Sequence, residues 1–231
     1  ALHRAQGKPV VALAAIVQHS PLILLVNRRK VSVIDSLQGS RIMLTPHETE
    51  LFAYLRREEV TQFTTVPHSF DTQDLIEGRV DAMSGYATDE PYLLKKVGFP
   101  YLVFNPTAVG IHFYGDTLFT NAARIKGSPE RVRAFRAAAI KGWQYALAHP
   151  EDIADLILAK YSRRHEREHL LFEANELKRL MQPDLVEIGQ QSASRWQQIA
   201  ETYAELGMVP PKPTIDGLIF DADVRKLPAW I

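Results

Sequence analysis

The sequence predicts an α/β fold, and two observations indicate it. From Val10 to Phe104, short apolar runs alternate with turn residues and helix-start signals, the pattern of strands and helices in alternation. From Ser128 onward, amphipathic helical segments follow one another with few strand signals between them. A chain of 231 residues with 46% hydrophobic residues has enough apolar material for one large domain or for two smaller ones.

The first hundred residues are expected to supply the strands, since their apolar runs are short and bounded by turn residues. Thr45-Pro46-His47-Glu48 resembles a helix start with a capping box, and predicts a helix that runs to about Arg57. The strand–helix–strand order predicts βαβ units and a largely parallel sheet. The expected strands are Val10 to Ile16, Leu22 to Val26, Arg41 to Leu44, Phe63 to Val66, Val80 to Ser84 and Tyr101 to Phe104, with short helices from Thr72 to Gly78 and from Pro91 to Val97.

Four helices are expected after residue 127, the first opened by Ser128-Pro129-Glu130. Apolar residues recur at steps of three and four in the first and the last of them, which predicts that these stripes face a core. The stripes are Val132, Phe135, Ala139, Trp143 and Ala146 in the first helix, and Ala193, Trp196, Ile199, Tyr203 and Leu206 in the last.

Composition excludes several classes of function. Lys plus Arg equals Asp plus Glu, at 27 each, so the chain has no overall field that would attract nucleic acid. The absence of cysteine excludes disulfides, thiolate metal sites, iron–sulfur clusters and cysteine nucleophiles. No apolar run approaches the roughly 20 residues that cross a bilayer, and Ala1 to Lys8 lacks the apolar core of a signal peptide.

An ordered set of short motifs resembles one family of proteins. The set is Gln18-His19-Ser20-Pro21, Pro67-His68-Ser69-Phe70-Asp71, Gly78-Arg79-Val80-Asp81-Ala82, Asp89-Glu90-Pro91, Phe113-Tyr114-Gly115-Asp116, Gly142-Trp143 and Ala148-His149-Pro150. With these motifs the chain resembles periplasmic solute-binding proteins of the thiamine-pyrimidine-precursor (NMT/THI-like) type. It is also similar to the extracytoplasmic sensor domains of bacterial histidine kinases and diguanylate cyclases.

The resemblance implies a type II periplasmic-binding-protein fold, in which two α/β lobes are joined by crossing strands with a cleft between them. On this basis residues 1–26 form a first-lobe segment and a crossing strand, 27–112 an inserted second lobe, and 113–231 the return crossing and the helical remainder of the first lobe. Leu22 to Val26 and His112 to Leu118 are the expected crossings. Members usually begin with two further strand–helix units, so we expect Ala1 to start inside a lobe. Either the upstream part is not included in this sequence, or the protein compensates by dimerisation or strand exchange, since open sheet edges invite pairing.

The resemblance also implies a function, which is binding without catalysis. The lobes are expected to close on a small organic ligand, such as a thiamine-pyrimidine precursor, in the periplasm or another extracytoplasmic space. The expected partners are the ligand and either a membrane permease or the protein's own transmembrane signalling module. No cofactor and no metal is expected.

The expected ligand-binding residues follow predicted strands, because ligands of open α/β folds lie beyond the carboxyl ends of strands. Tyr86 offers a ring for stacking, and the carboxylates of Asp89 and Glu90 accept hydrogen bonds from ring amines. Helix capping by Thr88 or Asp89 is the alternative role of this segment. The other candidates are His19, Ser20, His68, Tyr114, Gly115, Asp116 and Thr117.

Each of these other candidates also has a structural alternative. His19 and Ser20 can instead satisfy backbone groups in a tight turn. Residues 114–117 can form a set of hydrogen bonds that stabilises a hinge, and Gly115 permits close backbone approach. His68 precedes a turn that needs polar residues in any case.

A competing prediction is a zinc metallopeptidase. His165-Glu166-Arg167-Glu168-His169 fits the H-E-x-x-H pattern, which places two imidazoles one helical turn apart. The segment is rich in charge and has no evident third ligand, so a solvated helix start explains it better. The related thiamine-pyrimidine synthases use a cysteine-rich motif that this chain lacks, which argues against their iron-dependent chemistry.

Overall fold

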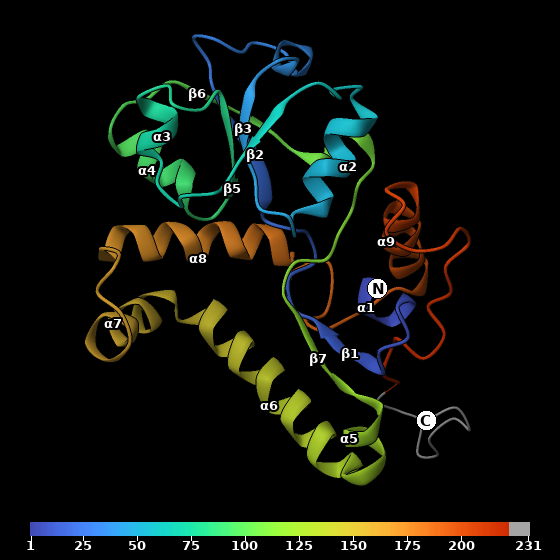
Figure 1. The fold of residues 1–231 in the computed structure, drawn as a ribbon. Helices are drawn as coiled ribbons and strands as arrows, with labels where there is room; N and C mark the ends of the chain where they lie inside the picture. Colours follow the sequence, from blue (N-terminus) through green and yellow to red (C-terminus); the bar gives the residue numbers. More distant parts are fainter. Residues whose placement is uncertain (222–231) are drawn as a thin grey trace. The chain divides into compact units, whose positions relative to one another are not determined.

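The computed structural model describes residues 1–221 and contains two compact units (Figure 1). One unit, here called unit 2, is the continuous segment Pro21–Ile111. The other, unit 1, combines Ala1–Ser20 with the described residues from His112 onward. The chain therefore passes from one unit to the other at Ser20–Pro21 and again at Ile111–His112, whereas the sequence predicted the divisions at 26/27 and 112/113.

Unit 2 is built on a five-stranded sheet in the order β4-β3-β5-β2-β6. Its strands are β2 (Leu22–Asn27), β3 (Arg41–Met43), β4 (Thr64–Val66), β5 (Ala82–Tyr86) and β6 (Tyr101–Phe104). β3 pairs in parallel with β4 and β5, but β2 pairs antiparallel with both β5 and β6. The prediction of a largely parallel sheet is therefore wrong for β2. The segment from β2 to β3 contains only the 3₁₀ turn Ile34–Leu37 and no crossover helix, so this pair of strands is not a βαβ unit.

Helices cover both faces of this sheet, which explains why all six residues of β2 are buried. The helices are α2 (Thr49–Arg57), α3 (Gln73–Ile76) and α4 (Glu90–Lys96), and α2 lies on the opposite side from α3 and α4 (Figure 1). Ile23 and Leu25 pack with Leu75 of α3 and Leu94 of α4. Because successive side chains of a strand point to opposite faces, Leu24 faces the other layer.

Helix α2 ends where the sequence predicted, but it begins at Thr49 rather than at Pro46. Residues 45–48 form a turn ahead of it, in which the Glu48 carboxylate accepts a hydrogen bond from the Thr45 backbone N–H at 2.8 Å. This is one of the two bonds of the predicted capping box. It closes a turn outside the helix because Glu48 itself occupies the N-cap position.

Unit 1 contains two strands and most of the helices. β1 (Val10–Ala15) and β7 (Thr117–Asn121) pair antiparallel, and Ile219 forms a parallel bridge to Ala12 on the other edge of β1. The helices are α1 (Leu2–Ala5), α5 (Ala122–Gly127), α6 (Pro129–Ala148), α7 (Pro150–Lys160), α8 (Arg167–Met181) and α9 (Ala193–Glu205). The four predicted helices are confirmed as α6 to α9, whereas α5, capped by the Asn121 side chain, was not predicted. Among the described helices, none combines the length and the apolar character that a membrane span requires.

The buried face of α6 differs from the predicted stripe. Val132 is buried, but the side chain of Phe135 is 62% exposed. Trp143 of the predicted stripe packs, together with Ile140 and Leu147, on a cluster around Ala14, Ile16, Val17 and Met181, here called the β1 core. In α9 the prediction is confirmed for Trp196 and Ile199, which are buried, whereas Ala193 at the helix start is exposed.

Candidate functional site

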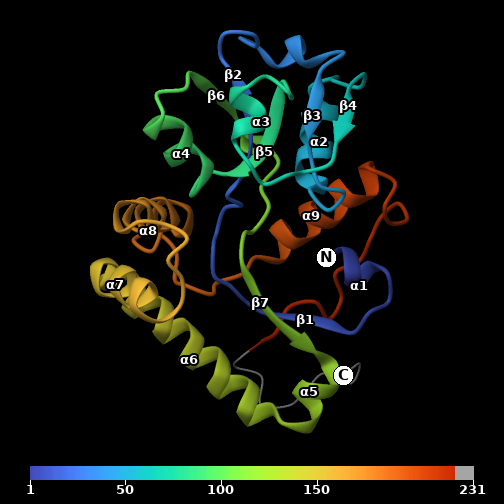
Figure 2. The same cartoon turned by 60° about the vertical axis from the view of Figure 1, so that its left-hand side comes forward.

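The candidate residues of unit 1 lie on two segments that run side by side, one after β1 and one before β7 (Figure 2). The backbone N–H groups of Ile16 and Val17 donate to the Asp116 carbonyl, at 2.9 and 3.2 Å. The Gly115 N–H donates to the Val17 carbonyl at 2.9 Å, and the Ser20 N–H donates to the Phe113 carbonyl at 3.0 Å. These bonds hold His19 and Ser20 next to residues 113–116.

Gly115 is required by the closeness of these two segments. A Cβ atom at this position would lie 2.9 Å from the Val17 Cβ and 3.2 Å from the His19 carbonyl oxygen. The close approach that the glycine permits is therefore one between two parts of the chain. Thr117 continues this packing, since its hydroxyl donates to the Gly115 carbonyl at 3.2 Å.

Tyr114 is buried and is held on all sides. Its hydroxyl oxygen accepts a hydrogen bond from the Ser192 N–H at 2.8 Å, and its ring lies 5.0 Å from the Trp196 ring. The guanidinium carbon of Arg195 lies 4.8 Å from the centre of the Tyr114 ring. These contacts agree with the alternative role considered for Tyr114, which is to stabilise a hinge through hydrogen bonds. Asp116, in contrast, is exposed.

His19 lies among polar residues that sequence reasoning missed. Its backbone N–H donates to the Leu180 carbonyl at 3.1 Å, and its ring lies 6.4 Å from that of His112. Burial lowers the pKa of His19, a hydrogen bond with the Gln182 side chain raises it, and the nearby charges of Arg195 and His112 lower it. No local pattern in the sequence could indicate this group, because His19, His112 and the segment that contains Gln182 and Arg195 lie more than 60 residues apart.

The candidates of unit 2 gather at the end of β5. Tyr86 is its last residue, and its side chain is 53% exposed. The Glu90 carboxylate accepts a hydrogen bond from the Tyr86 N–H at 2.7 Å. Asp89 occupies the N-cap position of α4 without a side-chain capping bond, so the helix capping considered as its alternative role is not observed. Burial raises the pKa of Glu90, the backbone N–H bonds of Tyr86 and Glu90 lower it, and the Asp89 charge raises it.

His68 belongs to the same group and has both ring nitrogens engaged. Its Nδ1 accepts a hydrogen bond from the Phe70 N–H at 2.9 Å, so the proton lies on Nε2, which donates to the Ser84 carbonyl at 3.0 Å. The structure thus brings together His68, Tyr86, Asp89 and Glu90 in unit 2. It brings together His19, Ser20 and residues 114–117 in unit 1.

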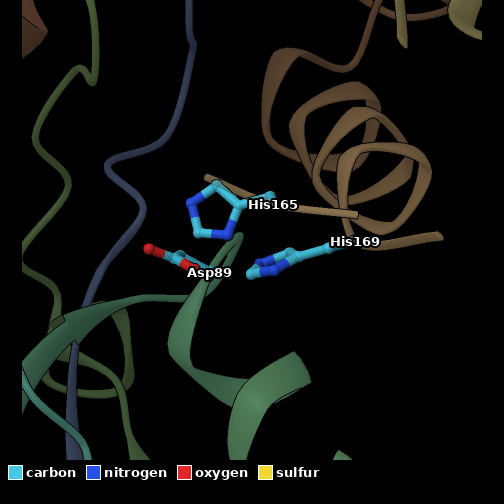
Figure 3. A group of neighbouring side chains, drawn as sticks. All are labelled: Asp89, His165 and His169. Carbon is cyan, nitrogen blue, oxygen red and sulfur yellow. The ribbon is translucent and has the colours of Figure 1, made fainter. Parts of the chain in front are cut away.

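The H-E-x-x-H segment straddles the start of α8. His165 precedes the helix, Glu166 is its N-cap residue and His169 lies in the first turns. The two imidazole rings meet edge to face, with their centres 4.1 Å apart (Figure 3). His169 is only 2% exposed, so the interpretation of the whole motif as solvated is wrong for this residue.

Comparison with known proteins identifies the family and the fold. The family described as NMT1/THI5 like matches residues 1–153. A formylaminopyrimidine-binding protein from Halalkalibacterium halodurans is 33% identical over 86 residues, a match that covers 36% of this chain and 26% of that protein. The chain thus matches about a quarter of the length of this curated relative.

Two solved structures show the fold at low sequence identity. The periplasmic aliphatic sulphonate binding protein SsuA from Escherichia coli superposes with a TM-score of 0.60 at 16% identity, covering 98% of this chain and 75% of that one. A Candida albicans protein described as exhibiting the generic periplasmic binding protein structural fold gives a TM-score of 0.63 at 14% identity, covering 100% and 79%. The chain therefore has the periplasmic-binding-protein fold. Because the family match covers 153 of its 231 residues, this chain belongs to the NMT1/THI5-like family.

Proposed function

We propose that this chain is a solute-binding domain, whose units 1 and 2 act as the two lobes of a clamp that closes on a small organic ligand. The family, the fold and the name of the formylaminopyrimidine-binding relative support this proposal. They also favour a thiamine-pyrimidine precursor or a related aminopyrimidine as the ligand. The site of action is then the periplasm or another extracytoplasmic space, and the protein binds without catalysis.

The observation that carries the proposal is where the two groups of candidates lie along the chain. In unit 2, the Ala87 N–H donates to the Pro21 carbonyl at 2.8 Å, and Tyr86 pairs with Leu22. The Tyr86–Glu90 loop is therefore bonded to the first residues of that unit. In unit 1, His19 and Ser20 are the last residues before the same crossing, so one peptide bond, Ser20–Pro21, joins the two groups.

Each group offers a different kind of contact. The exposed Tyr86 ring gives a platform for stacking, and the Asp89 and Glu90 carboxylates accept hydrogen bonds from exocyclic amines. Unit 1 offers His19, Ser20 and Asp116. Two compact units joined at two crossings can respond to a ligand by hinge motion, in which a few residues absorb the change.

Isothermal titration calorimetry of the full chain tests this proposal. The panel consists of thiamine-pyrimidine precursors, aminopyrimidines, sulfonates and amino acids. We expect one class to bind, and Tyr86→Ala to weaken its binding by roughly tenfold, because stacking on an aromatic ring contributes about 1–3 kcal/mol. Tyr161→Ala removes another exposed ring, which lies at the C-cap position of α7, and should leave the affinity unchanged. Absence of binding across the panel by the folded chain would contradict the proposal.

A solute-binding domain acts through a partner protein that recognises its closed, ligand-bound form. We propose either an ABC permease or a transmembrane signalling module of the same protein. Co-purification of the chain with membranes that contain either candidate partner distinguishes the permease from the signalling module. Only the true partner should bind the ligand-loaded chain better than the ligand-free chain.

Sedimentation of the chain at increasing concentration tests separately whether it forms a homodimer.

A further inference from the structure

Three basic side chains gather beside the crossing segments of unit 1 without an acidic partner. His19 lies on the first segment, His112 begins the second, and Arg195 lies in the first turn of α9. In residues 1–221, no carboxylate forms an ion pair with any of the three. Asp116, which is close in the chain, is exposed and bonds to this group only through its backbone carbonyl.

Three arginines on the other helices of unit 1 differ from Arg195 in this respect, since each forms an ion pair with a carboxylate. Arg133 pairs with Glu130 and Arg179 with Glu176, each one helical turn away. Arg167 of α8 pairs with Glu151 and Asp155 of α7. Arg195 lacks such a carboxylate partner, as does Arg136 of α6, whose Nε donates to the Leu13 carbonyl at 2.7 Å.

The guanidinium of Arg195 is nevertheless held in a fixed orientation. Its Nη1 donates to the Gln18 carbonyl at 2.8 Å, and its plane lies over the Tyr114 ring. Gln18 is itself buried and donates to the Ala15 and Gln190 carbonyls. Within the described chain Nε and Nη2 of Arg195 have no hydrogen-bond partner, and these two donors form the fork that suits two oxygens of one anion.

The two histidines complete the group. His112 is exposed, and its ring meets that of His19 edge to face. The Arg195 charge disfavours protonation of His19, so the group would be stabilised by a negative charge placed among its members. Ring N–H groups of histidine donate to an anion in either protonation state.

We infer that Arg195, His19 and His112 form a receptor for an oxyanionic group of the ligand, a carboxylate, sulfonate or phosphate. This inference rests on the proposed function and narrows it, because it requires the solute to carry a negative charge. Arg195 is the bidentate anchor, and the two imidazoles are single donors. Tyr114 and Gln18 are positioning residues that orient the guanidinium.

Histidine-detected NMR on the full chain tests the receptor with simple probes. Methanesulfonate is titrated at constant ionic strength, and dimethyl sulfone serves as its uncharged counterpart. We expect methanesulfonate to shift the ring resonances of His19 and His112 saturably and to raise the pKa of His19, whereas dimethyl sulfone does neither. Arg195→Gln should weaken this binding at least tenfold, and Arg195→Lys, which retains the charge but not the fork, should weaken it less.

The control is Arg131→Gln, which removes an exposed arginine of α6 and should leave the response unchanged. Circular dichroism verifies that each variant is folded. Equal responses of the wild type and folded Arg195→Gln, or an equal response to dimethyl sulfone, would overturn the receptor. If a neutral aminopyrimidine binds through Tyr86 while methanesulfonate gives no response, the solute-binding function stands and the receptor is wrong. If methanesulfonate binds at Arg195 but no pyrimidine of the panel binds, the receptor stands and the proposed pyrimidine class is wrong.

Discussion

Gly115 and His19 illustrate how single residues of unit 1 are constrained by the segment opposite. Gly115 leaves room for Val17, which is buried, and for the His19 carbonyl. The His19 ring lies close to two other basic groups, and its backbone is bonded to Leu180. At both positions a neighbour far away in the sequence determines which side chain fits.

Gly115→Ala is expected to destabilise the protein. The added methyl group would lie 2.9 Å from the Val17 Cβ, so the two segments must separate, and overpacking of this kind costs about 1–3 kcal/mol. The free energy of unfolding in urea measures the change. Gly142→Ala is the matched control, because Gly142 lies within α6 with open space around it. This control should gain about 0.5–1 kcal/mol.

The stability of the protein should depend on pH through His19. Its pKa in the folded chain is lowered below the usual value of 6.5, so the unfolded state binds a proton first as the pH falls. Folding stability contributed by neutral His19 is therefore present above about pH 6.5 and is lost as the pH falls toward the folded pKa. Between about pH 7.5 and about pH 5.5, the free energy of unfolding of His19→Gln should fall less than that of the wild type.

The exposed His47 provides the comparison for this prediction. His47→Gln should keep the pH dependence of the wild type. An identical pH dependence of His19→Gln and the wild type would contradict the predicted shift.

At the scale of elements, the orientation of α6 and the direction of β2 are the two features that local sequence did not determine. The apolar residues of α6 occupy more than one face, so two stripes compete at helical spacing. Ile140 and Leu147 pack on the β1 core beside Trp143 of the predicted stripe, whereas Phe135 of that stripe is exposed. For β2, a continuous apolar run indicates burial on both faces but carries no information on direction.

Substitutions on α6 should show which of its two apolar faces contributes to stability. Ile140→Ala removes a side chain that packs in the β1 core and contacts the Gly189 region, and should cost about 2 kcal/mol. Phe135→Ala removes an exposed side chain and should change the stability by at most about 0.5 kcal/mol. Urea unfolding of both variants measures these values. A larger loss for Phe135→Ala would favour the stripe predicted from the sequence.

At the scale of the whole molecule, the two units differ in their continuity along the chain. Unit 2 is one segment, and its sheet and its core residues all lie within Pro21–Ile111. Unit 1 is interrupted by it, since β1 and β7 pair across that interruption. The interior strand β1 of unit 1 therefore depends on partners more than 100 residues away.

A fragment of residues 21–111 is expected to fold by itself. It contains every strand of its sheet and a buried cluster from β2, β3, β5, α3 and α4. Heteronuclear NMR should show dispersed amide signals, and thermal unfolding should be cooperative. A fragment from residue 112 to the chain end lacks β1, so β7 loses its partner strand, and this fragment should remain unfolded or partly folded. Cooperative folding of both fragments would contradict the dependence described above.

Much of the fold could be predicted from the sequence, because its signals are local. The apolar runs of β1 to β6 and the periodicity of α6 to α9 appear within windows of a few residues. The Tyr86–Glu90 loop could be indicated as a candidate site, because it combines a ring with two carboxylates after a strand. The bond from Tyr86 N–H to Glu90 and the missing cap at Asp89 could not, since both depend on the path of the backbone.

The sequence by itself determined the family, most of the strands and helices, and the candidate residues next to the crossings, because their signals lie in adjacent or regularly spaced residues. Only the tertiary structure decided that β2 runs against its neighbours, that α6 presents Ile140 rather than Phe135 to the core, and that His169 is buried. It alone brought Arg195 to Gln18 and Tyr114, across 177 residues in the first contact. The physical reason is that the burial of a side chain, or the lack of an ion-pair partner for its charge, depends on which distant segments come into contact. A local sequence pattern contains no information on such contacts.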